Sequence, residues 1–375
     1  MKVCLVRLVV SVVTVTSLIT SFSAIARASS LKRKGPEQPA LLVRAGTTSE
    51  IYLVASTGCV AAKCLRIYRT TIDASHFVKV SAPPVEGEKG GIAETTLVRL
   101  VFANADDGYA EVGSENPLRL YATANGARSW HQVSLPPNTD LLSMDVSSNA
   151  LYATTARCSL SGNQCNKYRV WRTSLSAKNW TLLPRLWVTG TGPKDNYYGP
   201  LVSVKGNTVW EVENGYKSVH LWTSHDAGRT FSRISTPALA SVAGCYLTPM
   251  TNLDIWAECP TGMEVSFLYS HDGGARWGAI SRDVFSGTGG GTFEPVSSEL
   301  AYLDYGLVNV KRYNLFRISD GGMRASAVDD LACTSVSLLF TNTSDGLADC
   351  AKNYTSSRLE RTNDGGSSWR RVSLP

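Results

Sequence analysis

Charged residues are scarce in this sequence, and the short signatures of several site chemistries are absent from it. Asp, Glu, Lys and Arg make up 18% of the 375 residues and hydrophobic residues 43%, a balance that excludes a highly charged disordered chain and a coiled coil. There is no CxxC pair, no HExxH, no DxDxDG run and no GKS/T stretch, which are patterns of zinc, calcium and phosphate sites. We therefore expect neither a metal ion nor another cofactor.

The first 28 residues have the composition of a secretory signal. Basic Lys2 and Arg7 precede an apolar run from Leu8 to Ile19, and small residues follow that run, which is the order of regions in such signals. A retained membrane anchor is the alternative, but the run is shorter than the roughly 20 apolar residues that span a bilayer core. We expect cleavage after Ala26 or Ala28.

The rest of the chain is expected to be secreted or periplasmic without a membrane span, because no second long apolar run follows the first. The net charge of the whole sequence is +6, but three basic residues lie within the first 28 residues, and without that segment 34 basic residues face 31 acidic ones. So small a surplus does not indicate a nucleic-acid-binding surface. We expect residues 29–39 to form a linker and residues 40–375 to form one domain.

Eight cysteines remain when Cys4 leaves with the signal, and an even number in an exported chain favours disulfides. They fall into four near pairs, 5, 7, 14 and 17 positions apart. Pairing between neighbours is the simplest arrangement, because none of the five histidines lies beside a pair to complete a zinc site. The expected disulfides are Cys59–Cys64, Cys158–Cys165, Cys245–Cys259 and Cys333–Cys350.

A short pattern recurs along the chain. It is clearest in residues 224–231, 270–277 and 362–369, where Ser or Thr, Asp, Gly and an aromatic residue keep a fixed spacing. Weaker copies place the aromatic position, or its equivalent, at residues 77, 130, 180 and 325. Seven units of one period, 44 to 53 residues apart, therefore fill the chain.

Each unit contains four runs with strand-like composition, separated by turn residues. In the fifth unit these runs are residues 245–248, 254–258, 266–269 and 279–281. Alternating apolar residues, many of them β-branched or aromatic, predict antiparallel strands. Four-stranded units repeated at this interval are typical of propeller blades.

The pattern S/T-x-D-x-G-x-x-aromatic resembles the Asp-box, or bacterial neuraminidase (BNR) repeat, of sialidase-like β-propellers. The resemblance covers about residues 40 to 375 and implies an all-β, seven-bladed propeller whose blades are four-stranded antiparallel sheets. Similarity to propellers of the photosystem assembly-factor type extends only to the repeats. In the resembled family the box lies between the third and fourth strands, on the face opposite the ligand site. That placement implies a structural role for Asp226, Asp272, Asp320, Asp364, Trp277 and Trp369.

The face away from the boxes carries the loops between second and third strands and the crossings between blades, and we call it the loop face. All four cysteine pairs are expected at this face, where disulfides would fix the shape of the loops. The crossing from Arg185 to Gly199 is rich in aromatic residues, which beside polar groups suit contacts with a sugar or a peptide. The candidate ligand-binding residues are Trp187, Asp195, Tyr197 and Tyr198.

Two functions fit this architecture. The favoured one is a monomeric, secreted, non-catalytic propeller that binds a protein or glycan partner of the extracellular space or cell envelope. The alternative is a carbohydrate-active hydrolase or lyase of sialidase-like fold, which needs paired carboxylates, or a tyrosine with a carboxylate. The sialidase aromatic-Arg-Ile-Pro motif is missing ahead of the first box. Glu94, Glu111, Glu213 and Glu258 are possible acids by position alone and are expected on the solvated surface.

The ring is expected to close without strand exchange. The first strand begins near Ala40 and the fourth strand of the last unit ends near Leu374, so no strand is left to exchange. Blade seven should then close on blade one by packing between sheets. Trp369 and the Cys333–Cys350 disulfide are expected to support that seam.

Overall fold

The structure is a computed structural model. The residues that it describes are 38–46, 49–56, 65–84, 97–112, 118–135, 140–158, 165–184, 199–214, 219–236, 239, 244–260, 265–280, 289–307, 313–331, 333, 335–353 and 356–374. The expected signal and most of the expected linker lie outside them.

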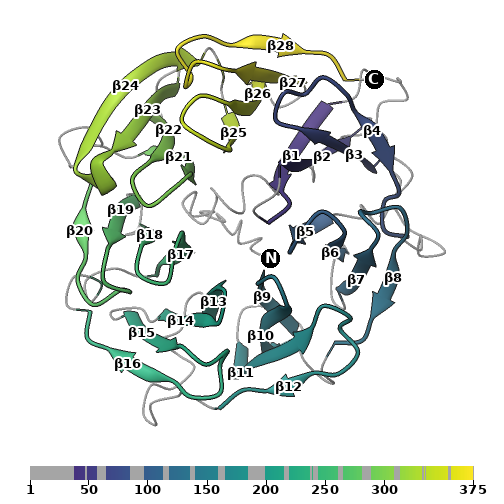
Figure 1. Ribbon diagram of the computed structural model, residues 1–375, viewed down its shortest axis with the longest axis vertical. Coiled ribbons are helices and arrows are strands. Elements are labelled where there is room, and N and C mark those ends of the chain that lie inside the picture. Colours follow the sequence, from purple (N-terminus) through teal and green to yellow (C-terminus); the bar gives the residue numbers. More distant parts are fainter. Residues whose placement is uncertain are drawn as a thin grey trace, which may run out of the picture.

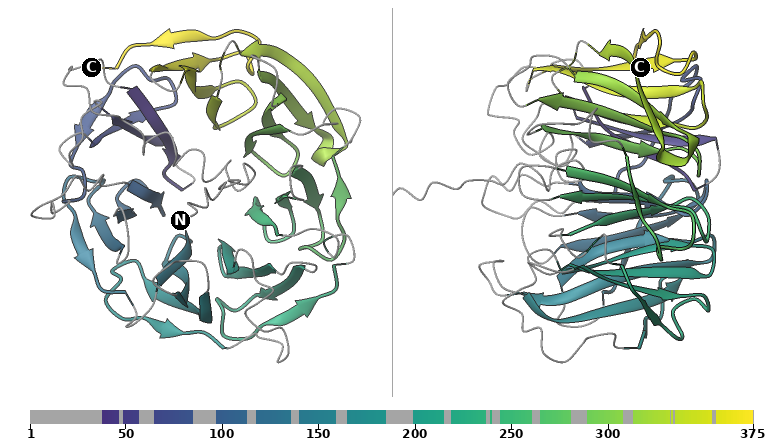
Figure 2. Two further views of the ribbon diagram at one scale, coloured as in Figure 1. Left: turned by 180° about the vertical axis from the view of Figure 1, so that it is seen from behind. Right: turned by 90° about the vertical axis from the view of Figure 1, so that its left-hand side faces the viewer.

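The strands form seven antiparallel sheets of four, arranged as blades in a ring (Figure 1). This confirms the predicted all-β, seven-bladed propeller. Within each blade the strands are hydrogen-bonded in chain order, from the innermost to the outermost. Seen edge-on, they run across the thickness of the ring (Figure 2). The described residues include the 3₁₀ turn Asp320–Gly322 and no α-helix.

Each blade has one strand at each of four positions, from the innermost to the outermost. The innermost are β1 (Gln38–Arg44), β5 (Leu97–Phe102), β9 (Asp140–Val146), β13 (Gly199–Lys205), β17 (Tyr246–Pro249), β21 (Gly289–Pro295) and β25 (Ser335–Phe340). The second are β2 (Glu50–Ser56), β6 (Asp107–Val112), β10 (Ala150–Cys158), β14 (Thr208–Asn214), β18 (Ile255–Pro260), β22 (Ala301–Leu307) and β26 (Gly346–Asn353). The third are β3 (Leu65–Thr71), β7 (Arg119–Ala124), β11 (Cys165–Ser174), β15 (Val219–Ser224), β19 (Val265–Ser270), β23 (Tyr313–Ser319) and β27 (Ser356–Thr362). The outermost are β4 (Val78–Val80), β8 (His131–Val133), β12 (Thr181–Leu182), β16 (Ser232–Ile234), β20 (Gly278–Ala279), β24 (Arg324–Leu331) and β28 (Arg370–Val372).

The hydrophobic core is divided into seven clusters, each between two neighbouring blades. Strand β14 shows why, because successive side chains point to opposite faces of a sheet. Its Trp210 and Val212 join the cluster with blade five, whereas Val209 joins the cluster with blade three. Each blade therefore depends on both neighbours to bury its apolar residues.

The repeated motif lies on the turn between the third and fourth strands. In blade seven the backbone N–H of Gly366 donates to Thr362 Oγ1 at 2.9 Å. The N–H of Ser368 donates to Asp364 Oδ1, also at 2.9 Å. The same two bonds recur in blades two, four and five, with Asn125 in place of Asp in blade two. The motif thus closes its own turn, because short polar side chains compete well for nearby backbone N–H groups.

The second glycine of the motif is approached closely by a side chain of the preceding blade. A Cβ on Gly366 would lie 2.6 Å from Leu315 Cδ2, and the φ of Gly366 is +89°. Glycine therefore permits both the left-handed turn and the close contact between blades. The side chains that approach Gly228, Gly274, Gly322 and Gly366 are those of Leu183, Leu221, Tyr269 and Leu315.

The ring closes as expected, without exchange of a strand between blades one and seven. The seam is a hydrophobic cluster that joins Leu42 and Ile51 of blade one to Leu339 and Leu359 of blade seven. Apolar packing between the two sheets therefore contributes to the described part of this seam.

The expectation that Trp369 supports the seam is wrong. Trp369 packs edge-on against Phe340, with ring centroids 6.0 Å apart, in the cluster between blades six and seven. Cys333 and Cys350 belong to that same cluster. The aromatic residue of each motif packs toward the preceding blade, so Phe77 of blade one is the motif residue at the seam.

Candidate functional site

Two of the expected disulfides lie among the described residues. Cys245–Cys259 joins the residue before β17 to the end of β18, with a Cα–Cα distance of 4.1 Å. Cys333–Cys350 joins a residue before β25 to β26, with a Cα–Cα distance of 5.4 Å. Each bond therefore ties two neighbouring strands of one blade at the loop-face side.

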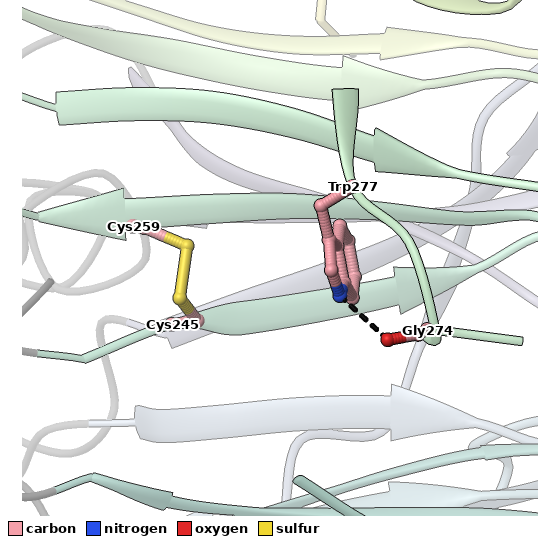
Figure 3. Close-up of a disulfide and its surroundings, with 4 residues drawn as sticks. All are labelled: Cys245, Cys259, Gly274 and Trp277. Carbon is pink, nitrogen blue, oxygen red and sulfur yellow. Dashed lines mark hydrogen bonds between the residues drawn. A yellow bond between two sulfur atoms is a disulfide. The ribbon is translucent and has the colours of Figure 1, made fainter. Parts of the chain in front are cut away.

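The sulfur atoms are packed inside the core rather than displayed at the surface. All four cysteines are fully buried. Cys245–Cys259 lies with Trp277 in the cluster between blades four and five (Figure 3). In the same view the Trp277 Nε1–H donates to the Gly274 carbonyl oxygen at 2.8 Å. These disulfides thus stabilise the scaffold beneath the loop face.

The other two expected disulfides stay predictions. Cys59 and Cys64 lie outside the described residues. Cys158 ends β10, Cys165 begins β11, and the two positions are directly opposite each other in the antiparallel ladder. That register is compatible with a bond between neighbouring strands.

The structure does not describe the four candidate ligand-binding residues. Trp187, Asp195, Tyr197 and Tyr198 all lie outside the described residues, between β12 and β13. Their role in binding stays a prediction.

Blade six departs from the motif geometry of the other blades. Ile318 stands at the position of the Ser or Thr hydroxyl, and Ala325 at the aromatic position. Asp320 has a φ of +53°, and its carboxylate pairs with Arg324 at 3.0 Å. The contacts of Asp320 therefore differ from those of Asp226, Asp272 and Asp364, for which the same structural role is expected.

The expectation that three candidate acids are solvated is wrong. Glu111, Glu213 and Glu258 are only 1%, 4% and 8% exposed, because the second strand of a blade is covered by a neighbouring blade on each face. Glu94, the fourth candidate, lies outside the described residues.

Sequence reasoning also missed four buried acids, Glu211, Asp304, Asp349 and Glu360, which are 2%, 0%, 8% and 8% exposed. A pattern in the sequence could have found one of them. Glu111, Glu258 and Asp304 each follow a buried aromatic residue by two positions, so each shares the covered face of its strand. The preceding aromatic residues are Tyr109, Trp256 and Tyr302.

Several polar side chains connect the innermost strands of neighbouring blades. Arg99 of blade two pairs with Glu111 at 3.0 Å and donates from Nη2 to the Leu142 carbonyl oxygen of blade three, also at 3.0 Å. The backbone N–H of Val204 in blade four donates to Asp145 of blade three at 2.8 Å. Bonds of this kind occupy polar groups at the edges of the innermost strands.

Burial raises the pKa of four carboxyl groups in the ring, those of Asp145, Glu211, Glu294 and Asp304. It raises the pKa of Asp145 to about 6, although two backbone N–H groups act in the opposite direction. It raises the pKa of Glu211 to about 8, helped by the nearby charge of Glu213. It also raises the pKa of Glu294 to about 8, against a backbone bond from Phe340 and the charge of Arg44. The pKa of Asp304 lies well above its usual value for the same reason.

The described residues offer little for metal or carboxylate chemistry. They contain no group of three or more His, Cys, Asp or Glu side chains that could hold a metal ion. They also contain no helix that is long and apolar enough to cross a membrane. Glu211 and Glu213 share one face of β14, but both are buried between blades three and four. A substrate at the surface of the ring would therefore reach neither of them.

Similarity to known proteins is confined to the fold. No family model matches the chain, and no curated protein matches it. YCF48 from Cyanidioschyzon merolae is 15% identical, with a TM-score of 0.51 over 75% of this chain and 85% of that one. YCF48 bound to D1 peptide is 14% identical, with a TM-score of 0.50 over 78% of this chain and 86% of that one.

A prolyl endopeptidase structure aligns over more of this chain. It is 10% identical and has a TM-score of 0.63, and the alignment covers 94% of this chain and 52% of that one. The chain thus spans about half the length of that peptidase. At these identities the likenesses show the propeller fold alone.

Proposed function

We propose that this chain is a secreted or periplasmic, monomeric, non-catalytic β-propeller that binds a protein or glycan partner of the extracellular space or cell envelope. The loop face is the binding surface, and the crossing that contains Trp187, Tyr197 and Tyr198 supplies aromatic contacts. The motif residues on the opposite face, such as Asp226 and Asp364, have a structural role.

The burial of the carboxyl groups carries this proposal. The acids of the second strands lie between blades, and several side chains there connect one blade to the next. They therefore support a rigid ring rather than reach a substrate. Rigid scaffolds of this kind commonly carry binding residues on their loops. Two buried disulfides at the loop-face side add to that rigidity.

A similar fold is known to accommodate a peptide, since one YCF48 structure is bound to D1 peptide. The alternative, a carbohydrate-active hydrolase or lyase, requires two acids, or a tyrosine and an acid, within reach of one sugar. Glu211 and Glu213 form a pair of acids on one strand, but their burial argues against that use. Non-catalytic binding is therefore the better supported function.

The test uses the chain purified from the culture medium or periplasm of its expression host. Mass spectrometry of its N-terminus should show cleavage after Ala26 or Ala28. The same preparation is applied to a glycan array and to a peptide array, and hydrolysis of carbohydrate substrates is followed in parallel. We expect binding on one array that is lost in Tyr197→Ala and Tyr198→Ala, with no release of reducing sugar. Turnover that Glu213→Gln abolishes would establish the alternative.

A further inference from the structure

The outermost strand of blade six differs from the other six outer strands. β24 runs from Arg324 to Leu331, a length of eight residues, whereas the outer strands of the other blades have two or three. It pairs with the whole of β23, with a bulge at Val328 where the register shifts between Leu315 and Phe316. Figure 1 shows β24 as a long arc on the outside of the ring.

The sequence explains why β24 continues where the other outer strands stop. Blade six has Ala325 at the motif position where Trp277 and Trp369 stand in blades five and seven. No large ring therefore has to insert between the blades at that point, and the strand can stay paired with β23. Further along, Val328 packs near Gly366 of the next blade, which fixes the middle of β24.

The outer edge of β24 is free among the residues that the structure describes. β24 is the last strand of its sheet, and no described strand pairs with its other side. Ser326 and Ala327 are exposed and small, so they leave the backbone N–H and C=O groups of this edge accessible. Proteins usually protect an edge of this kind by shortening it or by placing charges along it. β24 is not shortened, and its three charged residues and its bulge lie outside the stretch Ala325–Ala327.

The sequence places residues of opposite charge at the two ends of β24. Arg324 begins the strand with a side chain that is 81% exposed, and its ion pair with Asp320 is local. Asp329 and Asp330 lie at the other end of the same strand. A strand that pairs in antiparallel fashion would place its N-terminal end beside the two acids and its C-terminal end beside Arg324.

We propose that the free edge of β24 binds an extended polypeptide segment of another protein, which adds a fifth, antiparallel strand to blade six. The matching segment has basic residues at its N-terminal end, acidic residues at its C-terminal end, and β-branched residues between them. Addition of a strand gives affinity through main-chain bonds and specificity through side chains and charge. This site lies on the outer rim and is independent of the binding proposed for the loop face.

The test measures binding of two fluorescein-labelled octapeptides to the full mature chain by fluorescence anisotropy. The probe is Lys-Lys-Thr-Val-Thr-Val-Glu-Glu, and the control is Glu-Glu-Thr-Val-Thr-Val-Lys-Lys, which has the same composition and reversed charge polarity. We expect the probe to bind at least about tenfold more tightly than the control. Arg324→Glu should weaken binding of the probe by roughly threefold to tenfold, because it opposes the acidic end.

Proline substitution tests whether the main-chain groups of β24 bind the peptide. Neighbouring N–H groups of a strand alternate between the two edges, so one of Ser326→Pro and Ala327→Pro removes an outward N–H, and the other removes a bond to β23. The variant that keeps the wild-type melting temperature should bind the probe at least about tenfold more weakly than the wild type does. Equal affinity for the two peptides, or unchanged binding in both proline variants and in Arg324→Glu, overturns the proposal. Dimerisation of the unliganded chain that Arg324→Glu abolishes also overturns it, since the edge would then bind a second copy. A glycan or peptide that binds normally to these variants would leave the loop-face proposal standing.

Discussion

His271 Nδ1 lies 2.8 Å from Asp254 Oδ1, which places a histidine and a carboxylate in contact on the motif side of blade five. The other ring nitrogen of His271 lies near Gly321 of blade six, where an added Cβ would approach it to 2.5 Å. Hydrogen bonding to Asp254 raises the pKa of His271 above its usual value, and the backbone of Gly321 acts in the same direction. The imidazolium form thus links the turns of two blades.

Replacement of this histidine should change how stability depends on pH. Because the pKa is higher in the folded state, the stabilisation is full below about pH 6.5, the unfolded value, and is lost as the pH rises through the folded pKa. His271→Gln should therefore lower the melting temperature by on the order of 1–2 °C at pH 5.5, since the pair is half exposed, and by less at pH 9. His225→Gln is the control, because His225 has the same motif position in blade four but faces Thr208 Oγ1 at 3.5 Å. A decrease for His271→Gln that is equal at both pH values would contradict this assignment.

Glu211 should make the wild-type protein less stable as the pH rises. Its pKa is about 8 in the folded state because of burial and the charge of Glu213, so its neutral form is favoured by folding. The resulting loss of folding stability is absent below about pH 4.5, where Glu211 is protonated in both states, and grows until the pH passes the folded pKa. Glu211→Gln should flatten this dependence and raise the free energy of unfolding at pH 8 by on the order of a few kcal/mol. Chemical denaturation at pH 5 and pH 8 tests this, with the exposed Asp106→Asn as control, and a variant as pH-dependent as wild type would refute it.

Gly366→Ala should destabilise the protein through contact between blades as well as through backbone strain. The φ of Gly366 is +89°, and the new Cβ would lie 2.6 Å from Leu315 Cδ2. Gly206→Ala separates the two effects, because Gly206 has a φ of +59° with nothing near its Cβ position. We expect Gly206→Ala to cost about 1–2 kcal/mol and Gly366→Ala about 2–4 kcal/mol. Equal costs in thermal or chemical denaturation would show that the approach of Leu315 is unimportant.

Much of the fold follows from local patterns in the sequence. The four runs predicted for the fifth unit, 245–248, 254–258, 266–269 and 279–281, correspond to β17, β18, β19 and β20 within two residues at each end. Alternation marks the strands, and the repeated motif marks the turn that joins the third strand to the fourth. Seven such turns at one period determine the number of blades.

The same patterns could not show which blade covers which side chain. The motif gives the position of Trp369 along the chain, but not that its indole packs into the cluster between blades six and seven. Glu111 lies in the second strand of its blade. If one face of that strand were uncovered, alternate side chains would be solvated, but in the complete ring neighbouring blades cover both faces. The long edge of β24 occurs in the blade that has Ala325 at the aromatic position, and the sequence showed this blade only as a weak copy of the motif.

The direction in which the motif aromatics pack leads to a prediction about the weakest interface of the ring. Phe77 packs at the seam between blades seven and one, which no described strand crosses, whereas Trp369 packs between blades six and seven, which the chain connects directly. Trp369 also donates from Nε1 to the Gly366 carbonyl oxygen at 3.0 Å. Because the Trp369 ring is only partly buried, Trp369→Ala should cost about 2–4 kcal/mol, somewhat below the value for a fully buried aromatic.

The two variants should open different parts of the ring in hydrogen exchange followed by mass spectrometry. Phe77→Ala removes apolar contact from an interface that relies on sheet packing, so exchange should accelerate in β1 and β27, on either side of the seam. Trp369→Ala should accelerate exchange in β23 and β25 and leave β1 protected, since its cluster lies between blades six and seven. Accelerated exchange at β1 in Trp369→Ala, with none in Phe77→Ala, would mean that the seam depends on Trp369 after all. The expected pattern follows because each aromatic can stabilise only the interface into which it packs. Among the described residues, no covalent connection crosses the seam to limit its opening once Phe77 is removed.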